Sequence, residues 1–122
     1  MEFGITVPNN WGIADPSEVI NIGKFYEDIG FDSMWTMDHL FNIGYIGKRL
    51  NYKPYYHPLG TLSCISPLTK RIKLGTSILV LPYHNPIELA KYAATLDQFS
   101  TGRVILGVGV GGMTEEFQAL GI

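Results

Sequence analysis

The side chains best suited to chemistry are an adjacent pair, Asp38 and His39, which directly follows the apolar segment Phe31 to Met37. Such a segment predicts a buried strand, so the pair would lie at the carboxyl end of that strand. A neutral imidazole in this position can hydrogen-bond a ligand oxygen and exchange a proton near neutral pH. The alternative is a histidine that caps the strand through backbone contacts, and from the residues alone this simpler interpretation is favoured.

Glycines close a later apolar segment, Val104 to Val110, and form a second candidate site at Gly107, Gly109, Gly111 and Gly112. A strand that finishes in closely spaced glycines lets a flat ligand approach its backbone. A dinucleotide-binding loop is a poor interpretation, because these glycines end the fourth predicted strand and do not join a first strand to its helix.

These candidates need a scaffold of alternating strands and helices. Apolar segments predict strands at Phe3–Val7, Phe31–Met37, Ile72–Leu81 and Val104–Val110. Helices are expected from Asp15-Pro16 to Gly30, over Pro54–Ser66, from Asn85-Pro86 onwards and over Thr114–Leu120. The segment Leu40–Lys53 is expected to be a long loop, and such loops in compact domains are usually functional.

This alternation, without a linker or a low-complexity segment, predicts a single α/β domain over residues 1–122 with parallel strands. Two architectures share the pattern: a small doubly wound sheet and part of a (β/α)₈ barrel. Both place their ligands at the carboxyl ends of strands, where Asp38, His39, Ser77 and the glycines lie. The pattern therefore locates the site without choosing between the two folds.

Composition excludes several classes of protein. The chain has 122 residues, of which 46% are hydrophobic and 16% charged, as is typical of a globular domain. Lys and Arg number 9 against 11 Asp and Glu, with no basic run, so nucleic acid has no surface to bind. No segment predicts a membrane span, a secretion signal or a metal site. Cys64 has no partner for an internal disulfide, so we expect a cytoplasmic protein.

Short motifs follow one another along the whole chain, at Phe31–His39, Leu74–Leu79, Asn85-Pro86, Leu96–Arg103, Leu106–Gly112 and Glu115–Phe117. In this order and spacing they resemble the bacterial-luciferase-like monooxygenase superfamily, particularly its branch of oxidoreductases that depend on the deazaflavin coenzyme F420. The resemblance implies a TIM barrel, of which this chain has four of the eight βα units. A deazaflavin or flavin ring would lie over the carboxyl-end mouth, with F420 favoured over FMN and a small molecule as the substrate.

The same resemblance implies roles for individual residues. His39 would face the ring and take part in catalysis, and Asp38 would organise the loop that carries it. The peptide bond between Ser77 and Ile78 would be cis, in a bulge with Thr76 that supports the ring.

The glycines and one tryptophan complete the site that the resemblance implies. Gly107 and Gly109 would lie as bare backbone beneath the ring, while Gly111, Gly112 and Trp11 would line the substrate pocket. Some relatives that act on sugar phosphates or alcohols carry a glutamate near Gly111 or Gly112, so this chain lacks one candidate acid.

Four other side chains that can do chemistry are expected to be structural. Trp35 lies inside a predicted strand and Cys64 inside a predicted helix without a basic neighbour, so both are expected in the core. His57 and His84 are expected at the surface or as capping groups.

The resemblance implies hydride transfer or monooxygenation, but a barrel of this kind needs about 250 residues. Two explanations stay open: a truncated or split fragment, and a half-barrel that a second chain completes. We expect an oxidoreductase that is incomplete and inactive as this chain alone; the alternative is a non-catalytic half-barrel that binds cofactor or self-assembles. Because Phe3–Val7 and Val104–Val110 would be open edges, we expect a homodimer that pairs these strands.

Overall fold

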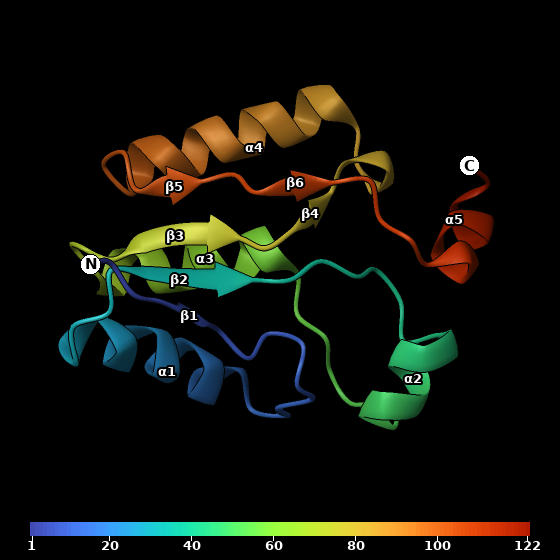
Figure 1. Cartoon of the computed structure of the whole chain (residues 1–122), viewed down its shortest axis with the longest axis horizontal. Coiled ribbons are helices and arrows are strands. Elements are labelled where there is room, and N and C mark those ends of the chain that lie inside the picture. The colour runs from blue at the N-terminus through green and yellow to red at the C-terminus, as the bar shows by residue number, and fades with distance from the viewer.

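In the computed structural model, which describes all residues from 1 to 122, parallel strands form a four-stranded main sheet. Its strands are β1 (Gly4–Thr6), β2 (Ser33–Thr36), β3 (Lys73–Thr76) and β5 (Val104–Ile105), in the order β1-β2-β3-β5. Two shorter strands, β4 (Leu79–Val80) and β6 (Val108–Gly109), pair in parallel further along the chain directions of β3 and β5 (Figure 1). The parallel α/β arrangement expected from the sequence is confirmed, and β1 and β5 are the sheet edges.

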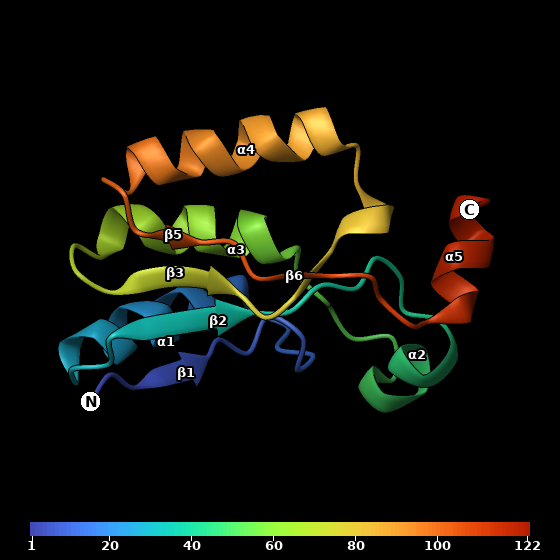
Figure 2. The same cartoon turned by 45° about the horizontal axis from the view of Figure 1, so that its top comes forward.

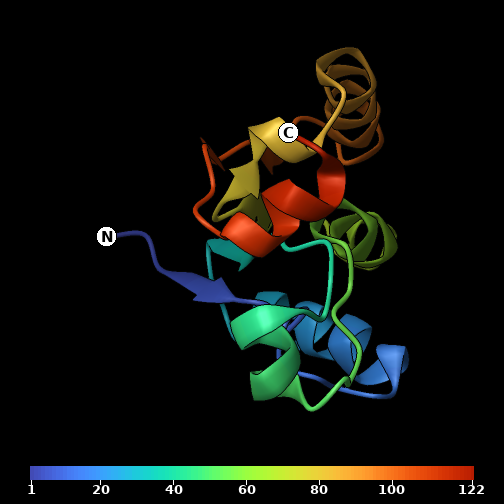
Figure 3. The same ribbon diagram turned by 90° about the vertical axis from the view of Figure 1, so that its right-hand side faces the viewer.

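The helices divide into two groups. Three of them, α1 (Pro16–Asp28), α3 (Pro58–Ile65) and α4 (Pro86–Phe99), cover one side of the main sheet, as Figure 3 shows. The short helices α2 (Gly44–Leu50) and α5 (Thr114–Leu120) lie at the end to which the strands point (Figures 1 and 2). Single 3₁₀ turns, η1 (Ser66–Leu68) and η2 (Leu81–Tyr83), follow α3 and β4. No helix has the length and apolar character needed to span a membrane.

The two longest helices begin where the sequence predicts. Asp15 caps α1 by accepting a hydrogen bond from the Ser17 N–H at 2.9 Å, and a proline occupies the first turn. Asn85 caps α4 in the same way, with its side-chain oxygen 2.9 Å from the Ile87 nitrogen. A side-chain acceptor paired with a proline that needs no partner satisfies the free N–H groups of a helix start.

The core lies between the main sheet and its helices. Met34 of β2 and Leu74 of β3 are fully buried. Three residues of α3 pack in the same core and are also buried: Leu59, Leu62 and Ile65. Because successive residues of a strand point to opposite faces, the residues next to Met34 and Leu74 belong to the other face of the sheet.

Two residues expected in the core are not part of it. Trp35 is half-buried on the face opposite to Met34, where its ring lies over Gly75; a Cβ at Gly75 would collide with the indole. Cys64 is exposed on α3, because the helix turns this position away from the sheet.

Both long strands expected in the second half of the chain are interrupted. The expected strand Ile72–Leu81 is β3 and β4, separated by Ser77-Ile78, whose peptide bond is cis, as the resemblance implied. The expected strand Val104–Val110 is β5 and β6. At the break, the Leu79 N–H donates to the carbonyl oxygen of Gly107 at 2.8 Å, so pairing resumes beyond the interruption.

Two further boundaries differ from expectation. The segment Leu40–Lys53 contains the helix α2, which is held in place because Ile46 and Leu50 are buried. The helix expected over Pro54–Ser66 begins only at Pro58, with His57 as its cap: its Nδ1 accepts the Gly60 N–H at 3.2 Å. A proline is favourable in the first turn of a helix and breaks it further in, which explains the later start. The capping role expected for His57 is confirmed.

A buried guanidinium ties the amino ends of the strands together. Arg103 is 9% exposed, and it donates to carbonyl oxygens of Ser66, Thr69, Ile72 and Ser100 at 2.7 to 3.2 Å. It also donates to the Thr69 hydroxyl at 2.9 Å. These groups come from η1, the approach to β3 and the end of α4, so one side chain joins three segments.

We predict that Arg103→Met lowers the free energy of unfolding by about 2–4 kcal/mol, because it leaves several buried carbonyl groups without donors. Chemical denaturation monitored by circular dichroism measures the change. Lys91→Met, which removes an exposed cation from α4, is the matched control and should shift stability by less than about 0.5 kcal/mol. Equal midpoints for the two variants would contradict the structural role of Arg103.

Candidate active site at the carboxyl ends of the strands

The helices α2 and α5 lie at the end to which the strands point (Figure 1), and the expected site residues follow the strands at this end. Asp38 and His39 follow β2, and Ser77-Ile78 lies between β3 and β4. Gly111 and Gly112 lie between β6 and α5. The loops after neighbouring parallel strands therefore meet at one mouth, as both barrel and doubly wound folds require.

His39 is anchored by a glutamate from the far end of the chain. Its Nδ1 lies 2.8 Å from Oε2 of Glu116, whose side chain is fully buried, while 29% of the His39 side chain is exposed. The other carboxylate oxygen, Oε1, accepts the N–H groups of Leu40 at 2.6 Å and Phe41 at 3.2 Å. Tyr83 donates its hydroxyl proton to Oε2 at 2.9 Å. Both oxygens of the carboxylate are thus fully used as acceptors.

The hydrogen bonds around Glu116 decide its ionisation. Burial by itself raises the pKa of this carboxyl, but the bonds from His39, from the Leu40 N–H and from Tyr83 outweigh burial and leave the pKa below its ordinary value of 4.5. The pKa of Tyr83 is raised by burial and by the negative charge of Glu116, so Tyr83 remains a hydrogen-bond donor. At neutral pH the cluster therefore contains an ionised carboxylate.

A second carboxylate–imidazole pair lies beside the first. Oδ2 of Asp38 is 2.7 Å from Nε2 of His84 and accepts the Val80 N–H at 3.0 Å. The Asp38 side chain is fully buried and that of His84 is 14% exposed, so the expectation of a surface or capping histidine is wrong for His84. The loop after β4 carries His84 back over the mouth, a path that the sequence does not reveal.

Tyr55 closes one side of the mouth. Its ring packs edge-on against the His39 imidazole, with the ring centroids 5.6 Å apart. Its hydroxyl is buried without a hydrogen-bond partner, as are Oδ1 of Asp38 and Oδ1 of Asn10. Burial, followed by the charge of Asp38, raises the pKa of Tyr55, so this phenol is protonated at neutral pH.

The glycines and Thr76 have packing roles between neighbouring strands. The hydroxyl of Thr76 donates to the carbonyl oxygen of Gly107 at 2.8 Å. A Cβ at Gly107 would collide with the Thr76 carbonyl oxygen, and one at Gly109 would collide with the Ile78 side chain. Close approach of strands thus accounts for Gly107, whereas the contact at Gly109 is with the end of a flexible side chain.

The residues expected in a substrate pocket are less uniform. Gly111 has φ +73°, and a Cβ there would lie 2.5 Å from Val80, so both backbone and space demand glycine. Gly112 faces open space. Trp11 is 61% exposed in the turn after β1.

Sequence reasoning missed three contributors to the mouth: Glu116, Tyr83 and Tyr55. Glu116 belongs to a motif that carries the family resemblance, but an acid in the first turn of a helix is explained well enough by the helix dipole. Tyr83 and Tyr55 carried no spacing signal, because Tyr83 ends the short 3₁₀ turn η2 and Tyr55 lies in the loop before α3.

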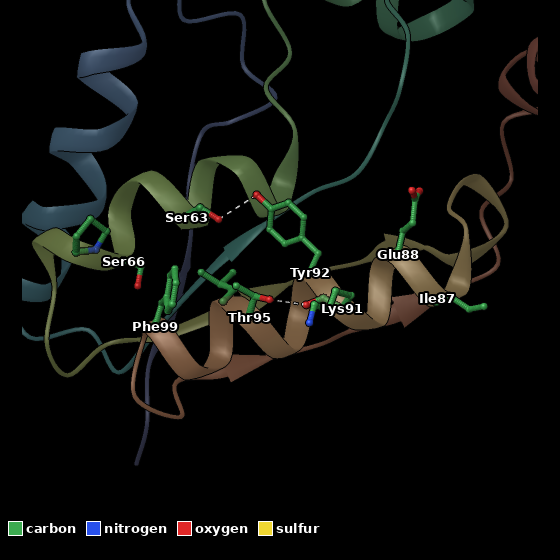
Figure 4. Close-up of a pocket in the computed structure, with 10 residues that line it drawn as sticks. Ser63, Ser66, Ile87, Glu88, Lys91, Tyr92, Thr95 and Phe99 are labelled. Carbon is green, nitrogen blue, oxygen red and sulfur yellow. Dashed lines mark hydrogen bonds between the residues drawn. The ribbon is translucent and has the colours of Figure 1, made fainter.

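A groove with a volume of about 1050 Å³ lies elsewhere, between α3 and α4 (Figure 4). Tyr92 and Phe99 line it from α4, and Ser63 donates to or accepts from the Tyr92 hydroxyl at 3.1 Å. It lies on the outer, helical side of the sheet and holds no cluster of buried titratable groups. We therefore locate the site from the polar cluster at the mouth.

The family model for luciferase-like monooxygenases matches residues 1–122. The chain belongs to this family. The structure of a coenzyme F420-dependent tetrahydromethanopterin reductase from Methanopyrus kandleri superposes on 99% of the chain, with a TM-score of 0.73 and 31% identity. The solved structures that it resembles are TIM barrels, so the parallel strands described above are part of that architecture.

Two relatives show the range of activities in the family. An F420-dependent glucose-6-phosphate dehydrogenase of Amycolatopsis mediterranei (strain U-32) is 33% identical over 107 residues, which is 87% of this chain and 31% of the relative. The alkanal monooxygenase alpha chain of Photorhabdus luminescens is 30% identical over 104 residues, which is 84% of this chain and 26% of the relative. The chain thus spans less than a third of these relatives and 30% of the reductase structure.

The ionisation of Glu116 predicts a dependence of stability on pH. Because its pKa is lower in the folded chain than the ordinary value of 4.5, the ionised carboxylate stabilises the fold above that pH. This contribution is lost as the pH falls through the folded-state pKa. Glu116→Gln should therefore cost about 1–3 kcal/mol at neutral pH, and the difference from wild type should shrink in acid.

Denaturation curves at several pH values measure this difference. Glu115→Gln, at the exposed neighbouring position on α5, is the matched control and should stay within about 0.5 kcal/mol of wild type at neutral pH. If the cost of Glu116→Gln is the same at neutral and acidic pH, the charge of Glu116 does not stabilise the fold.

Proposed function

We propose that this chain contributes the proton-exchanging histidine, His39, to the active site of a deazaflavin- or flavin-dependent oxidoreductase. F420 is favoured over FMN as the coenzyme. The observation that carries the proposal is the state of His39. One ring nitrogen is held by a buried carboxylate, and the other, Nε2, makes no hydrogen bond within the chain. A positioned imidazole with one free nitrogen at the mouth of a TIM-barrel fold suits proton transfer to a bound ligand.

The residues present at the mouth fit a flat ring. Ile78 is 40% exposed and Val108 45% exposed, so apolar atoms are available beside the polar cluster. The ring of a deazaflavin or flavin needs such an apolar surface together with a few hydrogen-bonding groups at its edge. Support for F420 comes from relatives with 33% and 31% identity whose names state F420 dependence.

His39 supplies proton transfer and position. In the neutral imidazole, Nε2 can accept a proton from a substrate hydroxyl. In the protonated imidazole, Nε2 can donate a proton to a carbonyl oxygen. Asp38 holds the preceding position fixed, because its carboxylate bonds to the Val80 N–H and to His84. The coenzyme, when bound, supplies hydride chemistry at its ring.

One observation favours a second candidate function, a half-barrel whose role is assembly. Apolar side chains that follow β5 and β6 are exposed, including Val110 at 77% and Leu106 at 40%. Exposed apolar surface beside an open sheet edge favours association. In this alternative a second copy of the chain pairs with β1 and β5, and cofactor binding is secondary.

Spectroscopic titration of the 122-residue chain with F420 and with FMN tests the first function against the second. We expect weak binding or none, and no catalysis, because the chain offers part of a ring surface but no glycine-rich phosphate loop; binding at micromolar concentration or tighter would contradict this. Light scattering on the same samples reports assembly. A dimer that binds neither coenzyme would favour the assembly role.

In an enzyme with a complete barrel, His39→Ala should lower turnover by about 10²–10⁴-fold, the usual effect of losing a general acid or base. Coenzyme affinity, measured by the same titration, should change much less. Lys91→Ala is the control, since Lys91 is exposed on α4 and has no contact with the residues of the mouth. Near-normal turnover of His39→Ala would show that His39 only caps the end of the strand and takes no part in catalysis.

A further inference from the structure

The two histidines at the mouth use opposite ring nitrogens. His39 faces its carboxylate with Nδ1 at 2.8 Å, whereas His84 faces Asp38 with Nε2 at 2.7 Å. His39 is also the more exposed of the two side chains, 29% against 14%. The free nitrogen of His39 is therefore Nε2, and the free nitrogen of His84 is Nδ1.

The partners of Glu116 decide which atom carries the shared proton. The N–H groups of Leu40 and Phe41 can only donate, so Oε1 is an acceptor. Oε2 receives the Tyr83 hydroxyl as well as His39. These four donors and the lowered pKa of Glu116 favour an ionised carboxylate, which places the proton shared with His39 on Nδ1.

This assignment matters for chemistry at the mouth. A neutral histidine has one N–H and one lone pair, and the wrong tautomer would present N–H where a base is needed. With the proton on Nδ1, the lone pair is on Nε2. When Nε2 takes a proton, the substrate O–H bond breaks, its electron pair stays on oxygen, and the resulting imidazolium lies against the Glu116 carboxylate.

We propose that Glu116 is the positioning residue of His39: it holds the imidazole in the Nδ1–H tautomer, and Tyr83 and the amides of Leu40 and Phe41 hold Glu116 in place. The proposal rests on the function proposed for His39 and adds a residue from α5 to that site. It also makes the docking of α5 against the loop after β2 a condition for a correctly oriented His39.

The chain itself allows a direct test by long-range ¹H–¹⁵N correlation spectroscopy, which distinguishes the two neutral tautomers of histidine. At a pH where the rings are neutral, wild type should show His39 as the Nδ1–H tautomer and His84 as the Nε2–H tautomer. His84 serves as an internal reference in the same spectrum. Wild-type His39 in the Nε2–H tautomer would overturn the proposal even if no variant folded.

Glu116→Gln sharpens the test. The backbone amides of Leu40 and Phe41 need the oxygen of the new side chain, so its NH₂ group is turned toward Nδ1 of His39 and can only donate. The His39 proton should then move to Nε2. Glu115→Gln is the matched control and should leave the tautomer unchanged; an unchanged tautomer in a folded Glu116→Gln variant would contradict the proposal.

In an enzyme with a complete barrel, Glu116→Gln should lower kcat by up to about 10⁴-fold with little change in coenzyme affinity, as expected when a catalytic histidine is held in the wrong tautomer. An inverted tautomer with normal kcat would overturn the positioning role. Normal turnover of His39→Ala would instead remove the proposed function of His39, so the two failures are distinguishable.

Discussion

Backbone groups at the two ends of a parallel sheet must find partners outside the sheet, and in this chain charged side chains provide them. At the amino ends, the Glu27 carboxylate accepts three successive N–H groups that lead into β3, and Arg103 donates to carbonyl oxygens around it. At the carboxyl ends, Asp38 accepts the Val80 N–H, and Glu116 accepts two N–H groups after β2. The fold depends on these hydrogen bonds between charged side chains and backbone groups, because the groups at the ends of the strands have no partner within the sheet.

The two ends use the same device with different consequences. Arg103 and Glu27 bond mainly to backbone groups, so their contribution is to stability. Asp38 and Glu116 can each bind an imidazole in addition to backbone N–H groups. Asp38 lies against His84, and Glu116 lies against His39. A buried carboxylate that first satisfies backbone amides can thereby also orient a histidine, which places a proton-exchanging group at the mouth without an additional structural element.

The interruption of the long strands belongs to the same region. Pairing of β3 with β5 stops after Gly75 and Ile105 and resumes as β4 with β6 at Leu79 and Val108. Between these pairings the chain carries Ser77 and Ile78 on one side and Gly107 on the other. Glycine at position 107 lets the two backbones approach closely at the break, where its carbonyl oxygen accepts the Leu79 N–H before pairing resumes in a second, two-stranded sheet.

Local sequence determined a large part of the fold. Hydrophobic runs predicted the strands, side-chain caps followed by proline predicted the starts of α1 and α4, and the strand–helix alternation predicted parallel strands. Motif order indicated the luciferase-like family, and the position of His39 after β2 indicated the mouth. These features depend on neighbouring residues, so the sequence reports them directly.

Tertiary structure decided the identity of the partners at the mouth. Glu116 is 77 positions from His39, and His84 is 46 positions from Asp38, so no periodicity or spacing connects them. Each reaches the mouth because the carboxyl ends of neighbouring parallel strands meet there, whatever the length of chain between them. The free ring nitrogen of His39 is also decided by tertiary structure. Glu116 approaches the ring from the Nδ1 side, so Nε2 is left free.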